Sequence, residues 1–267
     1  MHKPFQAVFS DIDGTLLNPQ HQLSPRNLAA GRALVAAGVP IVLVSARPPG
    51  AMRPLAEALG PKLPLIALNG ALILDGDDRV MHETPLAPAE LNSLAQLLAG
   101  APPLCLNYYR RQRWYSSAPQ SYWCRQEAAI TGLEPEPLPA EPGPIQKILL
   151  MAPAPLIAAW EQRLRAALPQ LSVQRSKEEY LEIASGRVDK AAALRWLCVR
   201  RGWAPDSVLA LGDNHNDLPL LRAAGYGVAL ANGPAAVRAQ ADAVAPGNGE
   251  DGWAQALERL FNLPAAD

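Results

Sequence analysis

The fold is decided by the stretch Ala7-Val8-Phe9-Ser10-Asp11-Ile12-Asp13-Gly14-Thr15. Its first four residues form a short, mostly apolar run that is typical of a strand buried in a parallel sheet. Ligands of open α/β sheets bind at the carboxyl ends of the strands, so Asp11 is predicted to lie at the floor of a site. Gly14 permits a tight turn that lets the two carboxylates converge. Because Asp and Gly are also favoured turn residues, the stretch alone leaves a plain turn open.

Strands and helices alternate on both sides of a long central segment. The alternation indicates an α/β fold with a doubly wound, Rossmann-like parallel sheet. Before the segment we expect strands at 7–10, 40–44 and 65–68, and helices at 24–37 and 49–59. After it we expect strands at 207–211, 226–230 and 242–244, and helices at 188–201, 217–224, 234–240 and 252–261.

The central segment, residues 86–185, has a different pattern that predicts an inserted α+β domain. We expect helices at 88–98, 120–131 and 155–168, and strands at 104–109, 113–117, 146–151, 171–175 and 180–184. Consecutive strands without a crossover helix favour antiparallel pairing. Residues 133–144 hold five prolines and three glutamates and are predicted to form a loop. The core domain is therefore expected to comprise residues 1–85 and 186–267.

Composition excludes several classes of protein. The chain has 267 residues, is 49% hydrophobic and carries a formal net charge of -1, so no basic surface for nucleic acid or an anionic membrane is expected. The three cysteines are far apart and lack the spacing of a disulfide framework or a structural zinc site. The sequence contains neither a signal segment nor an apolar run of about 18 residues. These features predict a cytoplasmic protein.

A second acidic cluster, Gly212-Asp213-Asn214-His215-Asn216-Asp217, also follows a predicted buried strand. Carboxylate oxygens at strand ends suit Mg²⁺, which takes one or two carboxylates together with waters and substrate phosphate. The alternative is a helix N-terminus, where Asp and Asn cap the first turn. Two acids and two asparagines exceed what a cap needs. His215 is interpreted as a loop or substrate-side residue rather than a ligand.

Two weaker signals complete the set. The sequence Ser45-Ala46-Arg47 follows the second predicted strand, and its hydroxyl and backbone N–H groups could hold a phosphate. Lys190 lies in the first turn of the helix that re-enters the core. A helical lysine is usually a solvated side chain, and Ser45 is more often a turn or cap residue. Arg47 is equally compatible with a substrate contact and with a pairing inside the core.

Together the four signals resemble the haloacid dehalogenase (HAD) superfamily of phosphohydrolases, and within it the Cof-type members of subfamily IIB, which have a large α+β cap. Residues 11–15 match the first motif, Ser45 the second, Lys190 the third and residues 212–217 the fourth. Two further segments fit, Asn69-Gly70-Ala71 and Ala231-Asn232-Gly233. Many relatives have Thr-Gly-Arg at residues 45–47, and Gly at Ala191. The hydroxyl is retained, and alanine is harmless on a helix.

The resemblance implies a Mg²⁺-dependent phosphatase that forms an aspartyl phosphate on Asp11. Asp13 would be the general acid and base, and Lys190 would place a positive charge near the nucleophile. The implied metal ligands are Asp11, Asp213 and the backbone carbonyl of Asp13, and Asp217 would support the metal either as a further ligand or by contacting one. The implied phosphate- or substrate-binding residues are Ser45, Ala46, Arg47, Asn69 and Asn216.

The implied partner is a small phosphorylated metabolite, such as a sugar phosphate, pyridoxal phosphate or a nucleotide-like ester, and the implied state is a monomer or weak homodimer. Two other readings stay open: a phosphotransferase or phosphomutase on the same scaffold, and a non-catalytic protein that binds a phosphometabolite. A generic nucleotide-binding protein ranks last, because neither G-x-G-x-x-G nor a P-loop lysine motif is present.

The insertion is rich in aromatic residues, and they could form a stacking wall for substrate or the cap's own core. We favour the core for most of them, since aromatic residues favour strands. They are Tyr108, Tyr109, Trp114, Tyr115, Tyr122 and Trp123.

Overall fold

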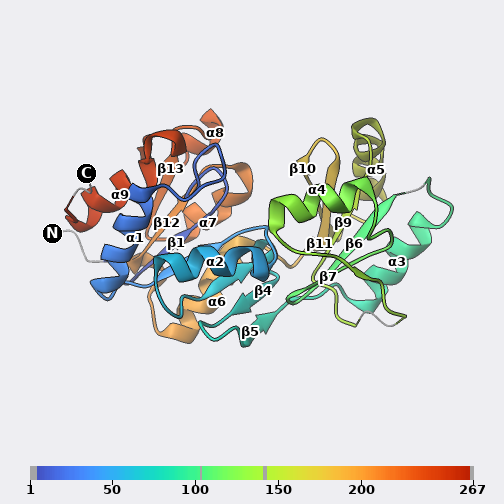
Figure 1. Ribbon diagram of the computed structural model, residues 1–267, viewed down its shortest axis with the longest axis horizontal. Coiled ribbons are helices and arrows are strands. Elements are labelled where there is room, and N and C mark those ends of the chain that lie inside the picture. The colour runs from blue at the N-terminus through green and yellow to red at the C-terminus, as the bar shows by residue number, and fades with distance from the viewer. Residues whose placement is uncertain (1–4, 103, 141–142, 265–267) are drawn as a thin grey trace. The chain divides into compact units, whose positions relative to one another are not determined.

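The computed structural model describes residues 5–102, 104–140 and 143–264. The chain divides into two compact units. The core unit comprises Met1–Ala46, Met52–Met81 and Asp189–Asp267, and the inserted unit comprises Arg47–Ala51 and His82–Val188. The ribbon in Figure 1 shows that each unit has a sheet and helices of its own.

The core unit is built on an eight-stranded sheet in the order β14-β13-β12-β1-β2-β3-β4-β5. The six strands from β14 to β3 pair in parallel, which confirms the predicted doubly wound sheet. They are β14 (Ala243–Ala245), β13 (Tyr226–Leu230), β12 (Val208–Gly212), β1 (Ala7–Ser10), β2 (Ile41–Val44) and β3 (Leu65–Ala67). β1 and β12 are neighbours near the middle of the sheet, so the two acidic segments leave it side by side.

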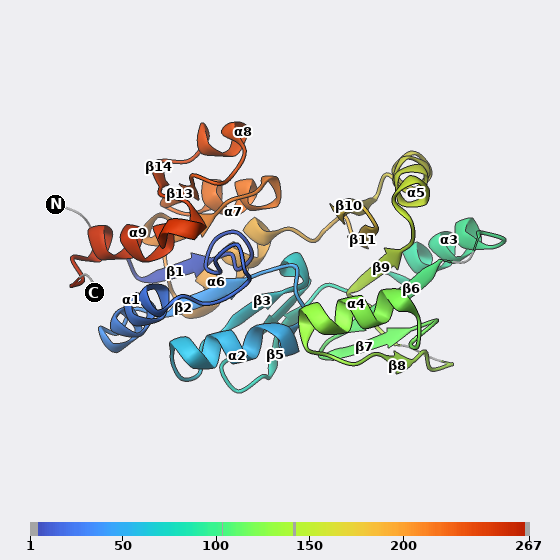
Figure 2. The same ribbon diagram turned by 45° about the horizontal axis from the view of Figure 1, so that its top comes forward.

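Helices cover both faces of the core sheet, as the rotated view in Figure 2 shows. On one side α1 (Pro25–Ala36) packs against α9 (Gly252–Phe261), and on the other α6 (Lys190–Arg201) packs against α7 (Leu218–Ala223). α2 (Pro49–Leu59) belongs to the core unit from Met52 onward, and the short α8 (Ala235–Arg238) belongs to it entirely. α1 begins after Ser24, whose side chain accepts a hydrogen bond from the backbone N–H of Asn27, as a Ser-Pro start predicts.

Two strands of this sheet were not predicted. After β3 the chain makes a 3-10 turn at Leu68–Gly70, and β4 (Leu72–Leu74) returns antiparallel to β3. β5 (Val80–Glu83) continues the sheet. Gly70 has a φ of +105°, and a Cβ there would lie 2.6 Å from the carbonyl oxygen of Asp189. The predicted turn at Asn69-Gly70 therefore brings the chain against the start of α6.

The inserted unit is a six-stranded sheet with helices on its faces. Its order is β10-β11-β9-β6-β7-β8, and all neighbours are antiparallel except β7 and β8. The strands are β6 (Cys105–Arg110), β7 (Arg113–Ser116), β8 (Glu136–Pro137), β9 (Lys147–Met151), β10 (Leu171–Lys177) and β11 (Tyr180–Ser185). The helices are α3 (Pro88–Leu98), α4 (Tyr122–Thr131) and α5 (Ala154–Ala167), and side chains from α3 and α5 share an apolar core with the strands.

The proline-rich segment differs from its prediction in one detail. Within the expected loop of residues 133–144, Glu136–Pro137 pairs with Tyr115 and Ser116 of β7. This two-residue strand lies at the edge of the sheet, where a proline leaves no ladder hydrogen bond unmade. The prediction of a pure loop was therefore wrong for these two residues.

Three of the six aromatic residues, Tyr109, Trp114 and Tyr115, are buried in the inserted unit. Tyr109 and Trp114 are buried and stack with ring centroids 6.1 Å apart. Tyr109 donates a hydrogen bond to Glu127 of α4, and Trp114 donates one to Asn107. Tyr122, in contrast, is 58% exposed. In the described part of the chain, no helix combines the length and apolarity needed to cross a lipid bilayer.

We expect Asn27→Ala to destabilise the core unit by about 2–4 kcal/mol. Asn27 is fully buried; its amide donates to the carbonyl of Leu16 at 2.8 Å and accepts from the N–H of Ala254 at 3.0 Å. The substitution leaves both backbone groups buried and unsatisfied. Urea denaturation measures the loss. Gln255→Ala, which removes an exposed amide bonded to the carbonyl of Glu250, is the control and should cost less than about 0.5 kcal/mol. Equal losses would contradict the assignment.

Candidate active site

The site lies where β1 and β12 end. These strands pair in parallel from Ala7↔Val208 to Ser10↔Leu211, so the residues that follow the two strands emerge at the same edge of the sheet. The backbone N–H of Asp11 still bonds the carbonyl of Leu211 at 2.9 Å. The two acidic segments, about 200 residues apart in sequence, are thereby brought together.

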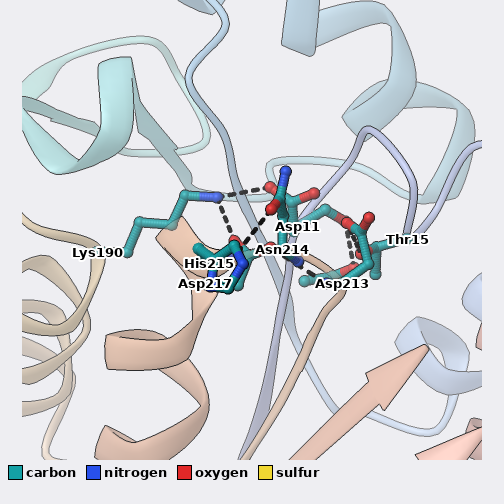
Figure 3. A network of polar contacts seen from close by, with 8 residues as sticks. Asp11, Thr15, Lys190, Asp213, Asn214, His215 and Asp217 are labelled. Carbon is teal, nitrogen blue, oxygen red and sulfur yellow. Dashed lines mark hydrogen bonds and ion pairs between the residues drawn. The ribbon is translucent and has the colours of Figure 1, made fainter. Parts of the chain in front are cut away.

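Lys190 is the centre of the charge network (Figure 3). Its Nζ donates to Asp11 Oδ1 at 2.6 Å and to Asp217 Oδ1 at 2.5 Å. The lysine is 2% exposed although it lies on the first turn of a helix. Asp189 caps that helix by accepting a hydrogen bond from the N–H of Ala192. The alternative prediction, that Lys190 is a solvated side chain on the helix surface, is therefore wrong.

Three carboxylates converge at this point. Oxygen atoms of Asp11, Asp213 and Asp217 all lie within 4.8 Å of one another. Asp213 also accepts a hydrogen bond from Thr15 Oγ1 at 3.1 Å. Gly14 makes the approach possible: its φ is +82°, and a Cβ there would lie 2.4 Å from Asp213 Oδ2. The glycine is required both for its backbone angle and for its missing side chain.

Asp217 serves the loop and the site at once. Its Oδ2 accepts hydrogen bonds from the backbone N–H groups of Asp213 and Asn214, at 3.1 and 3.0 Å. Its Oδ1 faces Lys190. The prediction that this residue caps the turn is thus confirmed, and the same carboxylate also contacts Lys190.

Burial and mutual repulsion set the electrostatics. Burial raises the pKa of Asp11 well above its ordinary value, and the charge of Asp217 adds to this, while Lys190 opposes it. Burial, followed by the charge of Asp217, raises the pKa of Asp213 to about 6. Burial alone would lower the pKa of Lys190, but Asp11 and Asp217 outweigh it and raise that pKa. One ammonium group, that of Lys190, thus faces a group of three carboxyl side chains.

This donor set fits a divalent cation. Carboxylate oxygens are hard ligands of the kind that Mg²⁺ and Ca²⁺ prefer. Two further positive charges among three carboxylates, of which Asp11 and Asp217 are buried and Asp213 is half-buried, would offset the repulsion that helps to raise the pKa values of Asp11 and Asp213. The side chain of Asp13 stands apart, because its carboxylate does not belong to the group of three that the described residues form.

Asp13 instead contacts a histidine that the sequence gave no reason to select. Its Oδ1 lies 3.2 Å from Nδ1 of His21, with the two side chains 40% and 69% exposed. Asn18 closes the turn that carries His21 by accepting hydrogen bonds from the N–H groups of Gln20 and Gln22. The hydrogen bonds of Asn18 are local and typical of a turn. That the turn places His21 beside Asp13 depends on the tertiary structure, which no short motif predicts.

The remaining predicted residues lie around the same strand ends or outside the core unit. Ser45 is 2% exposed and directly follows β2; its carbonyl accepts from the N–H of Asn69 at 2.9 Å. Ala46 is half-buried and ends the first segment of the core unit, whereas Arg47 belongs to the inserted unit. Asn216 is half-buried in the 3-10 turn His215–Asp217, and His215 is exposed.

Comparison with known proteins agrees with this geometry. The sequence profile of the haloacid dehalogenase-like hydrolases matches residues 8–257. A protein of Haemophilus influenzae, whose name assigns it provisionally to the phosphatases, is 35% identical over 96% of this chain and 98% of its own. The pyridoxal phosphate phosphatase YbhA of Escherichia coli is 30% identical over 94% of this chain and 96% of its own.

A solved structure shares the fold over the whole chain. The crystal structure of a haloacid dehalogenase-like hydrolase from Bacteroides thetaiotaomicron superposes with a TM-score of 0.88 at 28% identity, over 96% of this chain and 100% of that one. The chain belongs to the haloacid dehalogenase-like hydrolase family. As the resemblance of its motifs implied, it is an enzyme of the phosphoric monoester hydrolase class.

We expect Asp213→Asn to raise the melting temperature of the metal-free protein at pH 8 by a few degrees. A carboxyl group whose pKa rises from 3.8 to about 6 on folding favours the folded state while protonated, and this contribution is lost as the pH rises through 6. Allowing for partial exposure, the ionised group costs roughly 1–2 kcal/mol at pH 8. Thermal melts in EDTA from pH 4 to pH 8 measure the difference, which should vanish near pH 4.

Glu57→Gln is the matched control, because it removes one negative charge from an exposed position on α2. It should leave the melting temperature nearly unchanged at both pH values. A lower melting temperature for Asp213→Asn at pH 8 would show that the carboxylate stabilises the metal-free fold, contrary to its raised pKa.

Proposed function

We propose that the enzyme hydrolyses small phosphomonoesters through a phosphoaspartyl intermediate on Asp11, with Mg²⁺ as its cofactor. The observation that carries the proposal is the buried Lys190 ammonium between the carboxylates of Asp11 and Asp217. A nucleophile needs one oxygen oriented and the other available, and the lysine contact at Oδ1 of Asp11 supplies that orientation. When bound, Mg²⁺ would offset the repulsion between carboxylate and phosphate and neutralise charge on the transferring group.

The ligands that we propose for this ion are the side chains of Asp11, Asp213 and Asp217, with the backbone carbonyl of Asp13. Thr15 fixes one oxygen of Asp213, and the backbone N–H groups of the loop fix one oxygen of Asp217. These contacts hold the carboxylates in place before an ion arrives.

The first chemical step would form a bond between an Asp11 oxygen and phosphorus while the bond from phosphorus to the ester oxygen breaks. Asp13 would give its proton to the departing alkoxide. In the second step Asp13 would take a proton from water, which attacks phosphorus and releases inorganic phosphate and the Asp11 carboxylate. The side chain of Asp13 is partly exposed and does not belong to the cluster of Asp11, Asp213 and Asp217. This position suits a residue that must face the leaving group.

For the phosphate itself we propose Ser45, Ala46, Asn69 and Asn216 as hydrogen-bonding partners, with Lys190 as the charge partner. Arg47 belongs to the inserted unit, and we propose that this unit acts as the cap that selects the leaving group. A relative named as a pyridoxal phosphate phosphatase supports a small phosphorylated metabolite as substrate. A cytoplasmic location stays a prediction from the sequence.

We expect Asp11→Asn to lower phosphate release to below roughly a thousandth of the wild-type rate, because an amide cannot serve as the nucleophile. Phosphate release from a panel of phosphomonoesters, with Mg²⁺ and with EDTA, measures this. The melting curve of the variant verifies that the fold is intact. Retained activity would exclude Asp11 as the nucleophile. Product analysis with a second hydroxyl acceptor present separates hydrolysis from phosphotransfer.

Asp13→Asn tests the general acid and base separately. With alkyl phosphates we expect a loss of about 10²–10⁴-fold. p-Nitrophenolate leaves without a proton, so its first step should be spared while hydrolysis of the intermediate stays slow. Rapid mixing of the variant with p-nitrophenyl phosphate should therefore give a burst of nitrophenolate followed by a slow steady state. Asp11→Asn, which cannot form the intermediate, is the control without a burst. An equal loss with both esters and no burst would argue against the role of Asp13.

A further inference from the structure

One exposed side chain links the loop of Asp11 to the loop of Asp213. Asn232 follows β13, in the segment Ala231-Asn232-Gly233. Its Nδ2 donates to the carbonyl of Gly14 at 2.9 Å and to Asp213 Oδ2 at 3.3 Å. Gly14 lies in the loop after β1 and Asp213 in the loop after β12. The amide therefore bridges the two loops that carry the acidic residues.

The orientation of this amide is fixed from behind. The backbone N–H of Asn248 donates to Asn232 Oδ1 at 2.9 Å. Since an N–H can donate only to the oxygen end of an amide, the NH₂ end must face Gly14 and Asp213. Both amide hydrogens are thereby used, one for each partner. Neither aspartate nor serine offers two donors and one acceptor in this arrangement.

The backbone brings the segment close enough for these contacts. A Cβ on Gly233 would lie 2.1 Å from the carbonyl oxygen of Asp213. The missing side chain therefore lets the segment 231–233 rest against the main chain of the acidic loop. Asp213 is then held through both carboxylate oxygens, by Thr15 at Oδ1 and by Asn232 at Oδ2.

We infer that Asn232 is a positioning residue for the divalent cation site: it fixes the rotation of the Asp213 carboxylate and the distance between the loops of Asp11 and Asp213. The inference rests on the proposed metal-dependent function. Partners that orient a metal ligand typically contribute 10–100-fold to metal affinity. Because Asn232 is exposed, its contacts should contribute little to the stability of the metal-free protein.

Asn248 provides a matched control. It is 7% exposed, and its side chain donates to the carbonyl of Leu17 at 2.8 Å. It thus anchors the same nucleophile loop as Asn232 does, but its side chain has no bond to Asp213. Replacing Asn232 should therefore change metal affinity with little effect on stability, and replacing Asn248 should change stability with little effect on metal affinity.

The experiment is a titration of the full-length, metal-free protein with MnCl₂, followed by the EPR signal of free Mn²⁺ and by competition with Mg²⁺. Thermal melts in EDTA accompany each titration. For Asn232→Ala we expect about tenfold weaker binding of Mn²⁺ and Mg²⁺ with an almost unchanged melting temperature. For Asn248→Ala we expect a lower melting temperature with an unchanged dissociation constant. Asn232→Asp, which replaces the donor by a fourth carboxylate, should bind no better than Asn232→Ala.

Asp213→Asn separates the two ways of failing. If it binds Mn²⁺ as tightly as the wild type, the proposed metal site is wrong. If it loses binding while Asn232→Ala retains wild-type affinity, the metal site stands and the role of Asn232 is overturned. Equal losses of affinity for Asn232→Ala and Asn248→Ala would also overturn it, because loop stabilisation alone would then explain both.

Discussion

The repulsion among Asp11, Asp213 and Asp217 is the constraint on which the site depends. Parallel pairing of β1 with β12 forces the carboxylates together, and burial prevents water from screening them. One buried ammonium, on Lys190, offsets part of the charge. The fold therefore concentrates three carboxyl groups around a single ammonium, an arrangement whose oxygen atoms a divalent cation could use as ligands.

Close backbone packing makes that concentration of charge geometrically possible. Gly14 approaches the Asp213 carboxylate, Gly212 approaches Asp217, and Gly233 approaches the Asp213 carbonyl, each at a distance that a Cβ would not allow. Gly212 is the last residue of β12, and Gly14 and Gly233 lie in the loops that follow β1 and β13. Because their side chains are absent, backbone donors and the short side chains of Thr15 and Asn232 can reach the carboxylates directly. The geometry of the site is thus set by main-chain contacts, which loops on a rigid sheet can hold constant.

Much of this arrangement was predictable from local sequence, and the rest was not, for identifiable reasons. β1 and β12 are continuous apolar runs because both faces of a parallel sheet are covered, so their ends and the acids that follow them were recognisable. β4 follows β3 after only a 3-10 turn, without the intervening helix that separates the predicted parallel strands. β5 and β8 are not buried apolar runs, so neither carries the signal that marked β1 and β12. The pairing of Glu136–Pro137 depends on its place at the sheet edge, and the contact of His21 with Asp13 depends on how a turn folds back. Neither is encoded by neighbouring residues alone.

Asp217 shows how one carboxylate can both cap a turn and belong to a charge network. One oxygen satisfies the backbone N–H groups that β12 leaves unpaired as it enters the turn, and the other faces Lys190. The two oxygens of a carboxylate have enough lone pairs to accept all of these hydrogen bonds. The Asp217 carboxylate can therefore stabilise the loop and contact Lys190 at the same time. Fold and chemistry cannot be separated at such a residue, since any replacement changes both. The two roles can be separated at Asn232, an exposed residue whose amide contacts the carboxylate of Asp213. Asp217 and Asn232 each have three hydrogen-bonding partners, but Asp217 is fully buried and Asn232 is exposed. Burial, and not the number of partners, therefore separates the two cases.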